Sequence, residues 1–375
     1  MPWLGALVGL VLVTLTLLDA FEVVLLPRPV RRRWRINRVF FAAAWAAWAW
    51  LARRLPPGRR REDFAGVFGP LSMVALFSAW AILLMFGFGL LHWSLQQLLG
   101  GDPPMTLAQA MGVSGDAFFT LGYGDVVPHH ASGRLLVIVE AGTGFGFIAL
   151  TISYLPVLYQ HFSRRDYQLV ELAARAGTPP TVVGLLAWHA AVDDPAAFLA
   201  WLRDWELWAC DLVESHAAYP MLAFYRSQHE GHSWLAALAV LLDVCALGIA
   251  GDEAGGPPQA AATFTAARRA LRVVAGSLGV AVPATSTSTS AVLQPWTDAS
   301  DVMSLAPVLR ALWPGWQADA GTVERLGRLQ RTCRPHLNAL AAYLLLELPA
   351  WGDAPPPRRS GDVMARLTDD DGSQD

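Results

Sequence analysis

Three long runs of apolar residues divide the first part of the chain, at residues 3–26, 70–99 and 134–160. A helix rises about 1.5 Å per residue, so a run of ~24 residues forms a helix of about 36 Å, which crosses a bilayer with some tilt. No positive residue precedes the first run and no small-residue cleavage site follows it, which disfavours a cleaved signal peptide. The pattern therefore predicts three membrane-spanning helices.

A shorter apolar segment, residues 39–52, is rich in Trp and Ala and lies between two groups of arginines. If it crossed the membrane, one arginine group would lie outside, against the positive-inside rule. We therefore predict an interfacial helix on the inner membrane surface; a fourth crossing stays open, because its tryptophans would also suit two interfaces. The two groups are Arg28, Arg31, Arg32, Arg33, Arg35 and Arg38, then Arg53, Arg54, Arg59, Arg60 and Arg61.

A short helix and a loop are predicted between the second and third runs. Residues 106–119 follow two prolines and are too few and too polar to span a bilayer. Residues 100–104 carry an aspartate and no arginine, as expected of an external loop. The C-terminal end of the short helix would direct partial negative charge towards the next residues, which favours a cation there. Arg164 and Arg165 then mark the inner end of the third crossing.

Beyond residue 165 the sequence predicts a soluble helical domain. The predicted helices are 165–176, 181–191, 195–218, 233–249, 258–278 and 320–348, with breaks at residues 179–180, 255–257 and 285–290. Asp243 interrupts the apolar segment 233–249, so we predict a buried core helix there rather than a crossing. The absence of a β-α-β pattern with a glycine-rich loop argues against a nucleotide-binding domain. Residues 353–375 have the composition of a disordered tail.

Composition supports a membrane part joined to a soluble part. The mean hydropathy is +0.35, and only 16% of the 375 residues are charged. The net charge of −3 excludes nothing, and every basic residue is Arg. We expect free thiols, no enzymatic activity, no cofactor and no nucleic-acid partner. The spacing of Cys210, Cys245 and Cys333 indicates no disulfide framework, and His229 with His232 completes no paired metal motif.

The segment 118–128 reads Phe-Phe-Thr-Leu-Gly-Tyr-Gly-Asp-Val-Val-Pro. Gly122 and Gly124 can adopt positive φ without a Cβ clash, so the chain can turn successive backbone carbonyls towards one axis. Such carbonyls can replace the water shell of a K⁺ ion. A tight turn without function is the alternative, but the segment lies between two apolar runs of spanning length.

Residues 120–125 resemble the selectivity filter of prokaryotic potassium channels, whose usual form is Thr-Val-Gly-Tyr-Gly-Asp. The resemblance implies that the backbone carbonyls of residues 120–123 bind K⁺, the permeant ion, and that four copies of the chain surround it as a homotetramer. It also implies a hydroxyl ligand from Thr120 and a bracing ring from Tyr123. The chain departs from the family pattern at Leu121 and Phe119. The implied filter comprises Thr120, Leu121, Gly122, Tyr123, Gly124 and Asp125.

Further residues are predicted to support the filter or to gate it. The resemblance to potassium channels also implies that Asp116 and Phe119 support the filter and that Asp116 shares a proton with Asp125; the alternative for Asp116 is a solvated carboxylate. An acid within a crossing must face water, a partner or a cavity, so Glu140 is a candidate for gating. Asp19 and Glu22 are expected to face protein or to pair with nearby arginines. The other gating candidates are Gly142, Gly144, Gly146 and Pro156, although the glycines also suit tight helix packing.

Together these features predict an all-α membrane protein in five parts. These are an N-terminal transmembrane helix at 1–27, an interfacial segment at 28–63, a pore module of two helices and a pore loop at 64–165, a helical cytoplasmic domain at 166–352, and the tail. The predicted function is passive K⁺ conduction in the inner membrane of a prokaryote, either gated by the cytoplasmic domain or open as a background leak. A weakly selective cation channel, or a membrane-anchored sensor or scaffold with a non-conducting pore module, is the alternative.

Overall fold

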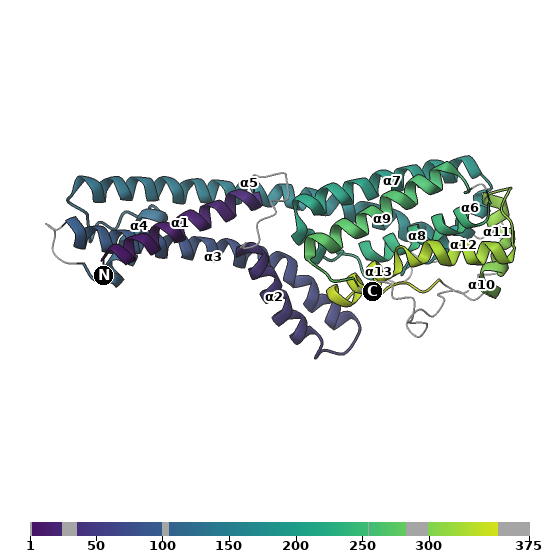
Figure 1. Cartoon of the computed structure of the whole chain (residues 1–375), viewed down its shortest axis with the longest axis horizontal. Helices are drawn as coiled ribbons and strands as arrows, with labels where there is room; N and C mark the ends of the chain where they lie inside the picture. The colour runs from purple at the N-terminus through teal and green to yellow at the C-terminus, as the bar shows by residue number, and fades with distance from the viewer. Residues whose placement is uncertain (1, 25–35, 100–104, 254, 283–298, 352–375) are drawn as a thin grey trace, which may run out of the picture. The chain divides into compact units, whose positions relative to one another are not determined.

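The computed structural model describes residues 2–24, 36–99, 105–253, 255–282 and 299–351. All regular structure in these ranges is helical, and the chain forms two compact units, residues 1–160 and 161–375 (Figure 1). The predicted boundary between membrane and soluble parts lay a few residues later, after residue 165. The arginines at 28–35, the external loop at 100–104, the break at 285–290 and the tail at 353–375 fall outside the described residues.

The first unit is built on two antiparallel helices, α1 (Pro2–Val24) and α3 (Arg59–Leu99). They pack closely because glycines face each other: a Cβ on Gly9 would lie 2.7 Å from the carbonyl oxygen of Gly87. At the other end of α1, the buried Asp19 accepts hydrogen bonds from Trp80 Nε1 at 3.0 Å and from the Asn37 amide at 3.1 Å. Asp19 thus faces protein, which is one of the two alternatives that the sequence left open.

Helix α2 (Ile36–Ala52) forms a hairpin with the start of α3 (Figure 1). Trp48 stacks on Phe64 at a centroid distance of 4.5 Å and donates a hydrogen bond to its carbonyl at 3.1 Å. This packing explains why α3 begins at Arg59, well before the predicted start at Pro70. The helix continues through Pro70. Whether α2 lies at the membrane interface stays a prediction.

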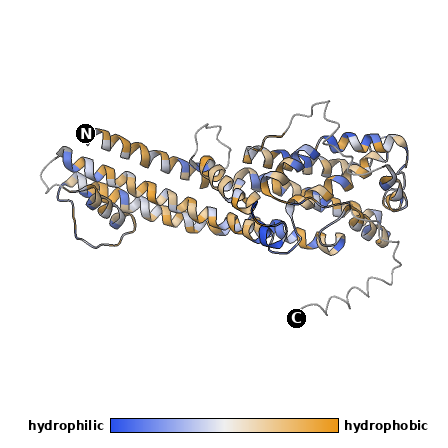
Figure 2. Ribbon diagram, turned by 90° about the horizontal axis from the view of Figure 1, so that it is seen from below, coloured by the Kyte–Doolittle hydropathy of each residue, from blue (hydrophilic) through white to orange (hydrophobic). Residues whose placement is uncertain are grey.

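Helix α4 (Leu107–Phe118) matches the predicted short helix, and α5 (Ala131–Ala176) supplies the last crossing. The sequence predicted two helices here, 134–160 and 165–176. Helix α5 is instead continuous, because residues 161–164 include no helix breaker. Helices α1, α3 and α5 are long and apolar enough to cross a membrane. Figure 2 shows hydrophobic residues along most of the length of the first unit's helices. The protein is therefore an all-α membrane protein.

The second unit packs around α8 (Trp234–Ala250), a buried helix as predicted. Within it, the buried Asp243 forms an ion pair with Arg334 and accepts hydrogen bonds from Gln330 Nε2 at 3.2 Å and Trp351 Nε1 at 3.0 Å. The other elements are α6 (Val182–Val192), α7 (Pro195–Ala218), the 3-10 helix η1 (Pro220–Phe224), α9 (Pro258–Leu278), α10 (Ala299–Ser304), α11 (Ala306–Leu312), α12 (Ala320–Arg331) and α13 (Arg334–Leu344).

One sequence prediction about this unit is wrong. The predicted helix 320–348 is two helices, α12 and α13, with a break at residues 332–333. Arg165, which the sequence placed at the inner end of the crossing, is buried in the second unit and donates hydrogen bonds to the carbonyls of Leu222 at 2.9 Å and Tyr225 at 2.6 Å. That the crossing ends at this arginine stays a prediction. The sequence alone does not indicate whether an arginine will donate hydrogen bonds to backbone carbonyls or to lipid headgroups.

Candidate functional site

The loop at residues 119–128 is held at the C-terminal end of α4. A capping box fixes the other end of that helix, because the Thr106 side chain accepts from the Gln109 amide while the Gln109 side chain accepts from the Thr106 amide. At the C-terminal end, the Leu121 amide donates to the Asp116 carbonyl at 2.9 Å. The Tyr123 amide donates to the Asp116 carboxylate, Oδ1, also at 2.9 Å. Two alternate amides of the loop are therefore bonded to one residue of α4.

The backbone of the loop alternates in handedness. Thr120, Gly122 and Gly124 have φ values of 55°, 74° and 72°, and the intervening Leu121 and Tyr123 are not in the left-handed region. A left-handed conformation costs an ordinary residue about 1–2 kcal/mol, and such strain gathers at functional sites. The sequence predicted positive φ for the two glycines but not for Thr120.

The carbonyl oxygens of residues 120–124 accept no hydrogen bond from any part of the chain that the structure describes. The amides of Leu121 and Tyr123 donate to Asp116 of α4 and not to these carbonyls. The carbonyls are therefore available to another electropositive group. A row of neutral backbone oxygens is a ligand set suited to a dehydrated monovalent cation.

The side chains of the loop are exposed within one copy of the chain. Leu121 is 53% exposed and Tyr123 is 74% exposed, so the Tyr123 ring does not brace the loop against its own subunit. Phe119 contacts the Phe118 ring edge-on at 5.2 Å. No hydrogen bond between Asp116 and Asp125 is found among the described residues, and the predicted roles of these side chains stay predictions.

The three glycines of α5 differ in their surroundings. A Cβ on Gly144 would lie 2.1 Å from the carbonyl oxygen of Phe118, so this glycine permits close contact between α5 and the end of α4. A Cβ on Gly142 or Gly146 would meet nothing within 4 Å. Helix α5 continues through all three and through Pro156. Gly144 therefore serves tight helix packing, which was the alternative to a hinge. A hinge at Gly142, Gly146 or Pro156 stays a prediction.

Glu140 is fully buried and contacts two polar side chains from other helices. His92 of α3 lies 2.9 Å from it, Nε2 to Oε2, and is 4% exposed. Ser114 of α4 is hydrogen-bonded to Glu140 Oε1 and donates to the Met85 carbonyl at 2.7 Å. Of the three possibilities that the sequence left, Glu140 faces a partner. His92 and Ser114 were not found from the sequence; a histidine within an apolar run was the available signal.

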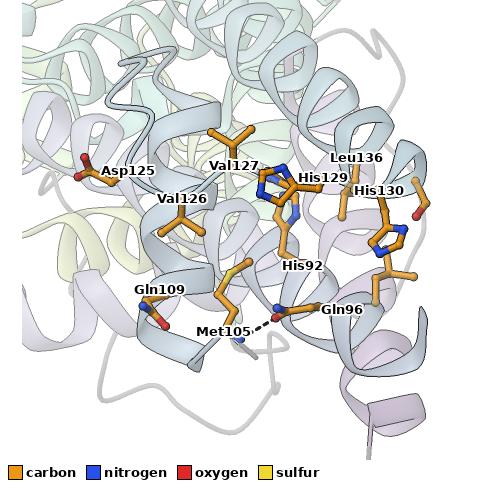
Figure 3. Close-up of a pocket in the computed structure, with 14 residues that line it drawn as sticks. His92, Gln96, Met105, Gln109, Asp125, Val126, Val127, His129, His130 and Leu136 are labelled. Atoms are coloured by element: carbon orange, nitrogen blue, oxygen red, sulfur yellow. Dashed lines mark hydrogen bonds between the residues drawn. The ribbon is translucent and has the colours of Figure 1, made fainter. Parts of the chain in front are cut away.

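A cavity of about 300 Å³ opens beside the loop, between the end of α3 and the start of α5 (Figure 3). Its lining includes His92, Gln96 and Gln109, together with Asp125, His129 and His130 from the loop and its continuation. Among the described residues no group of three His, Cys, Asp or Glu side chains could hold a metal ion. In the second unit, the rings of His229 and His232 lie 5.4 Å apart.

Comparison with known proteins shows that part of the first unit is similar to one protein family. Residues 75–160 match the model of a family described as ion channel. A membrane protein of Bacillus subtilis (strain 168), named as the uncharacterized membrane protein YdjJ, is 28% identical over 200 residues. That alignment covers 52% of this chain and 57% of the relative, so the chain spans little more than half the length of the relative it matches. No solved structure matches.

Proposed function

We propose that the protein conducts K⁺ selectively and passively across the membrane through residues 75–160, which match the ion-channel family. Residues 120–125 would form the selectivity filter, with the carbonyl oxygens of residues 120–123 as the ligands of K⁺. The observation that carries this proposal is the alternation of φ at Thr120, Gly122 and Gly124, with the intervening amides bonded to α4. This backbone supplies oxygens in sequence where a dehydrated ion needs them.

A homotetramer follows from the single loop in each chain. One loop supplies one oxygen at each level of the filter, and a closed ring of four loops surrounds the ion. The outward surface of α5 supports this arrangement, because the described part of the chain leaves more than half of several large apolar side chains there exposed. These are Leu135 at 61%, Ile138 at 67%, Val139 at 52%, Phe145 at 72% and Ile152 at 66% exposed. Lipid and neighbouring subunits would cover them.

The proposed orientation places the loop at the outer face of a prokaryotic inner membrane and the second unit in the cytoplasm. Arginines at the connection between α2 and α3 would lie inside, according to the positive-inside rule. These are Arg53, Arg54, Arg59, Arg60 and Arg61. Helix α5 belongs to both units. A signal received by the second unit could therefore act on the part of α5 that lies in the first unit without a separate linker.

K⁺ flux from liposomes tests this function. Purified protein is reconstituted with internal K⁺, and flux is followed with a proton ionophore present; the same preparation is then tested with Na⁺. We expect K⁺ flux well above Na⁺ flux. The variant Gly122→Ala should lose the preference, because alanine at φ 74° is disfavoured by about 1–2 kcal/mol in each of four subunits.

The matched control is Gly112→Ala in α4, where an added Cβ meets nothing within 4 Å. This variant should keep the preference of the wild type. Equal K⁺ and Na⁺ flux in the wild type would instead support a weakly selective cation channel. Absence of flux across pH, voltage and lipid composition would support a sensor or scaffold with a non-conducting module.

A further inference from the structure

The contacts among Glu140, Ser114 and His92 require a particular count of protons. Ser114 has one hydroxyl proton, yet its oxygen contacts both the Met85 carbonyl and Glu140 Oε1, and a carbonyl only accepts. Both contacts are hydrogen bonds only if Glu140 carries a proton and donates it to Ser114 while Ser114 donates to Met85. His92 Nε2–H then donates to the other carboxyl oxygen. One continuous chain of donors and acceptors joins α3, α5 and α4.

Removal of the Glu140 proton breaks this chain at α4. A carboxylate at Glu140 can only accept, so Ser114 must direct its single proton either to Glu140 or to Met85. Helix α4 then loses one of its two hydrogen bonds to its neighbours at this point. Because α4 carries Asp116, which holds the Tyr123 amide, the loop is held less firmly as well.

The cavity beside the loop gives this cluster a route to solvent. His92 both lines the cavity and contacts Glu140 at 2.9 Å, so a proton arriving at the histidine is one hydrogen bond from the buried acid. The other titratable groups around the cavity are Asp125, His129 and His130, and Asp116 is the only titratable residue of α4. The two acids of α1, Asp19 and Glu22, lie near its C-terminal end. The opposite end of α1, at Gly5, is the one that lies beside Ser94 of α3, two positions from His92.

We propose that Glu140, His92 and Ser114 form a proton-binding site, filled from the outer mouth through the cavity, whose occupancy sets how firmly the pore helix α4 is held. This inference rests on the proposed channel function. With the proton bound, the filter is supported and conducts; as external pH rises and the proton leaves, conduction falls. Glu140 and Ser114 are positioning residues, since neither belongs to the proposed filter.

Glu140→Gln tests the proposal, because glutamine reproduces the protonated acid. Its amide NH₂ donates to Ser114 and its carbonyl accepts from His92, so all the hydrogen bonds are kept at every pH. In wild-type liposomes we expect K⁺ flux to fall about fivefold between about pH 5.5 and about pH 8.5 outside, as expected for one lost hydrogen bond. In Glu140→Gln the flux should stay at the acid-side level throughout. The control His129→Gln/His130→Gln should keep the wild-type profile.

Infrared difference spectra of the same proteins provide a readout that needs no conduction. The wild type should show a protonated carboxyl C=O band that disappears as pH rises, and Glu140→Gln should lack this change. A pH profile of Glu140→Gln equal to that of the wild type would overturn the proposal, as would a profile abolished by the double histidine variant. If the band titrates but no preparation conducts, the proton site stands and the channel function fails.

Discussion

The Asp116 carboxylate accepts a hydrogen bond from the Tyr123 amide at 2.9 Å, which joins the last turn of α4 to the middle of the loop. The Asp116 carbonyl also accepts from Leu121, so one residue fixes two alternate positions of the loop. Gly122, which lies between these two positions, and Thr120 and Gly124, which flank them, have left-handed φ values. The filter geometry that we propose therefore depends on the end of the pore helix as much as on the glycines.

Asp116→Ala should weaken the preference of the channel for K⁺ over Na⁺. It removes the acceptor of the Tyr123 amide, at a cost of about 1 kcal/mol per subunit for a largely solvent-accessible hydrogen bond. We expect the ratio of K⁺ to Na⁺ permeability to fall several-fold. Asp116→Asn keeps an acceptor oxygen without the charge and should retain most of the ratio. Equal ratios in Asp116→Ala and the wild type would show that this contact does not shape the filter.

Gly144→Ala should destabilise the membrane unit. Its Cβ would lie 2.1 Å from the Phe118 carbonyl oxygen, so α5 must move away from α4, at a cost of about 1–3 kcal/mol for overpacking. Thermal unfolding in detergent measures the change. Gly142→Ala and Gly146→Ala are matched controls, since a Cβ there meets nothing within 4 Å. Both controls should unfold at or above the wild-type temperature; a drop in Gly142→Ala as large as in Gly144→Ala contradicts this account of α5.

Asp243→Asn should destabilise the second unit by about 3 kcal/mol, because it removes the carboxylate partner of the buried Arg334. Chemical unfolding followed by tryptophan fluorescence is a suitable measurement, since Trp351 also donates to Asp243. The control is Glu324→Gln, which disrupts a 3.9 Å ion pair with Arg328 on the surface. That pair should contribute less than about 1 kcal/mol. Equal effects of the two variants would refute the importance of the buried pair.

Acid should destabilise the second unit through His216. Burial, assisted by the charge of Arg165, lowers the pKa of His216 from 6.5 to about 3. The unfolded chain therefore binds the proton first, and the stability present above about pH 6.5 is lost progressively as pH falls towards about 3. Between about pH 6.5 and pH 4.5 this residue alone should cost about 2 kcal/mol.

His216→Gln has no proton to bind and can still donate to the Leu212 carbonyl, which Nδ1 contacts at 3.1 Å. Unfolding midpoints measured across this pH range should therefore fall less steeply in His216→Gln than in the wild type. The exposed His229, changed to Gln, should leave the slope unchanged. A slope in His216→Gln as steep as in the wild type would assign the acid effect to other groups.

Local signals in the sequence predicted several elements closely. The predicted helices 195–218 and 258–278 have the same bounds as α7 and α9, and the structure shows Asp194 and Pro195 at the start of α7, Pro258 and Gly279 at the ends of α9, and Thr106 with Gln109 capping α4. Each signal acts over a few residues, because a cap or a proline changes the backbone of its own turn. The glycines of the loop belong to the same class, since positive φ is a property of a single residue.

Long-range contacts explain what the sequence did not predict. Helix α3 starts at Arg59 because Phe64 stacks on Trp48 of a different helix, and the buried Arg165 donates to the Leu222 carbonyl of η1. Likewise, His92 and Glu140 are 48 positions apart in the chain, and no periodicity relates them. Partners of this kind follow from packing, which one sequence without its fold does not specify.

The reversal potential under bi-ionic conditions tests the central claim most directly. Purified protein is placed in a planar bilayer with K⁺ on one side and an equal concentration of Na⁺ on the other. If the carbonyl oxygens of residues 120–123 select K⁺, the current should reverse at a large potential of the sign set by K⁺, and Gly122→Ala should move this potential towards zero. A wild-type current that reverses at zero would contradict the account.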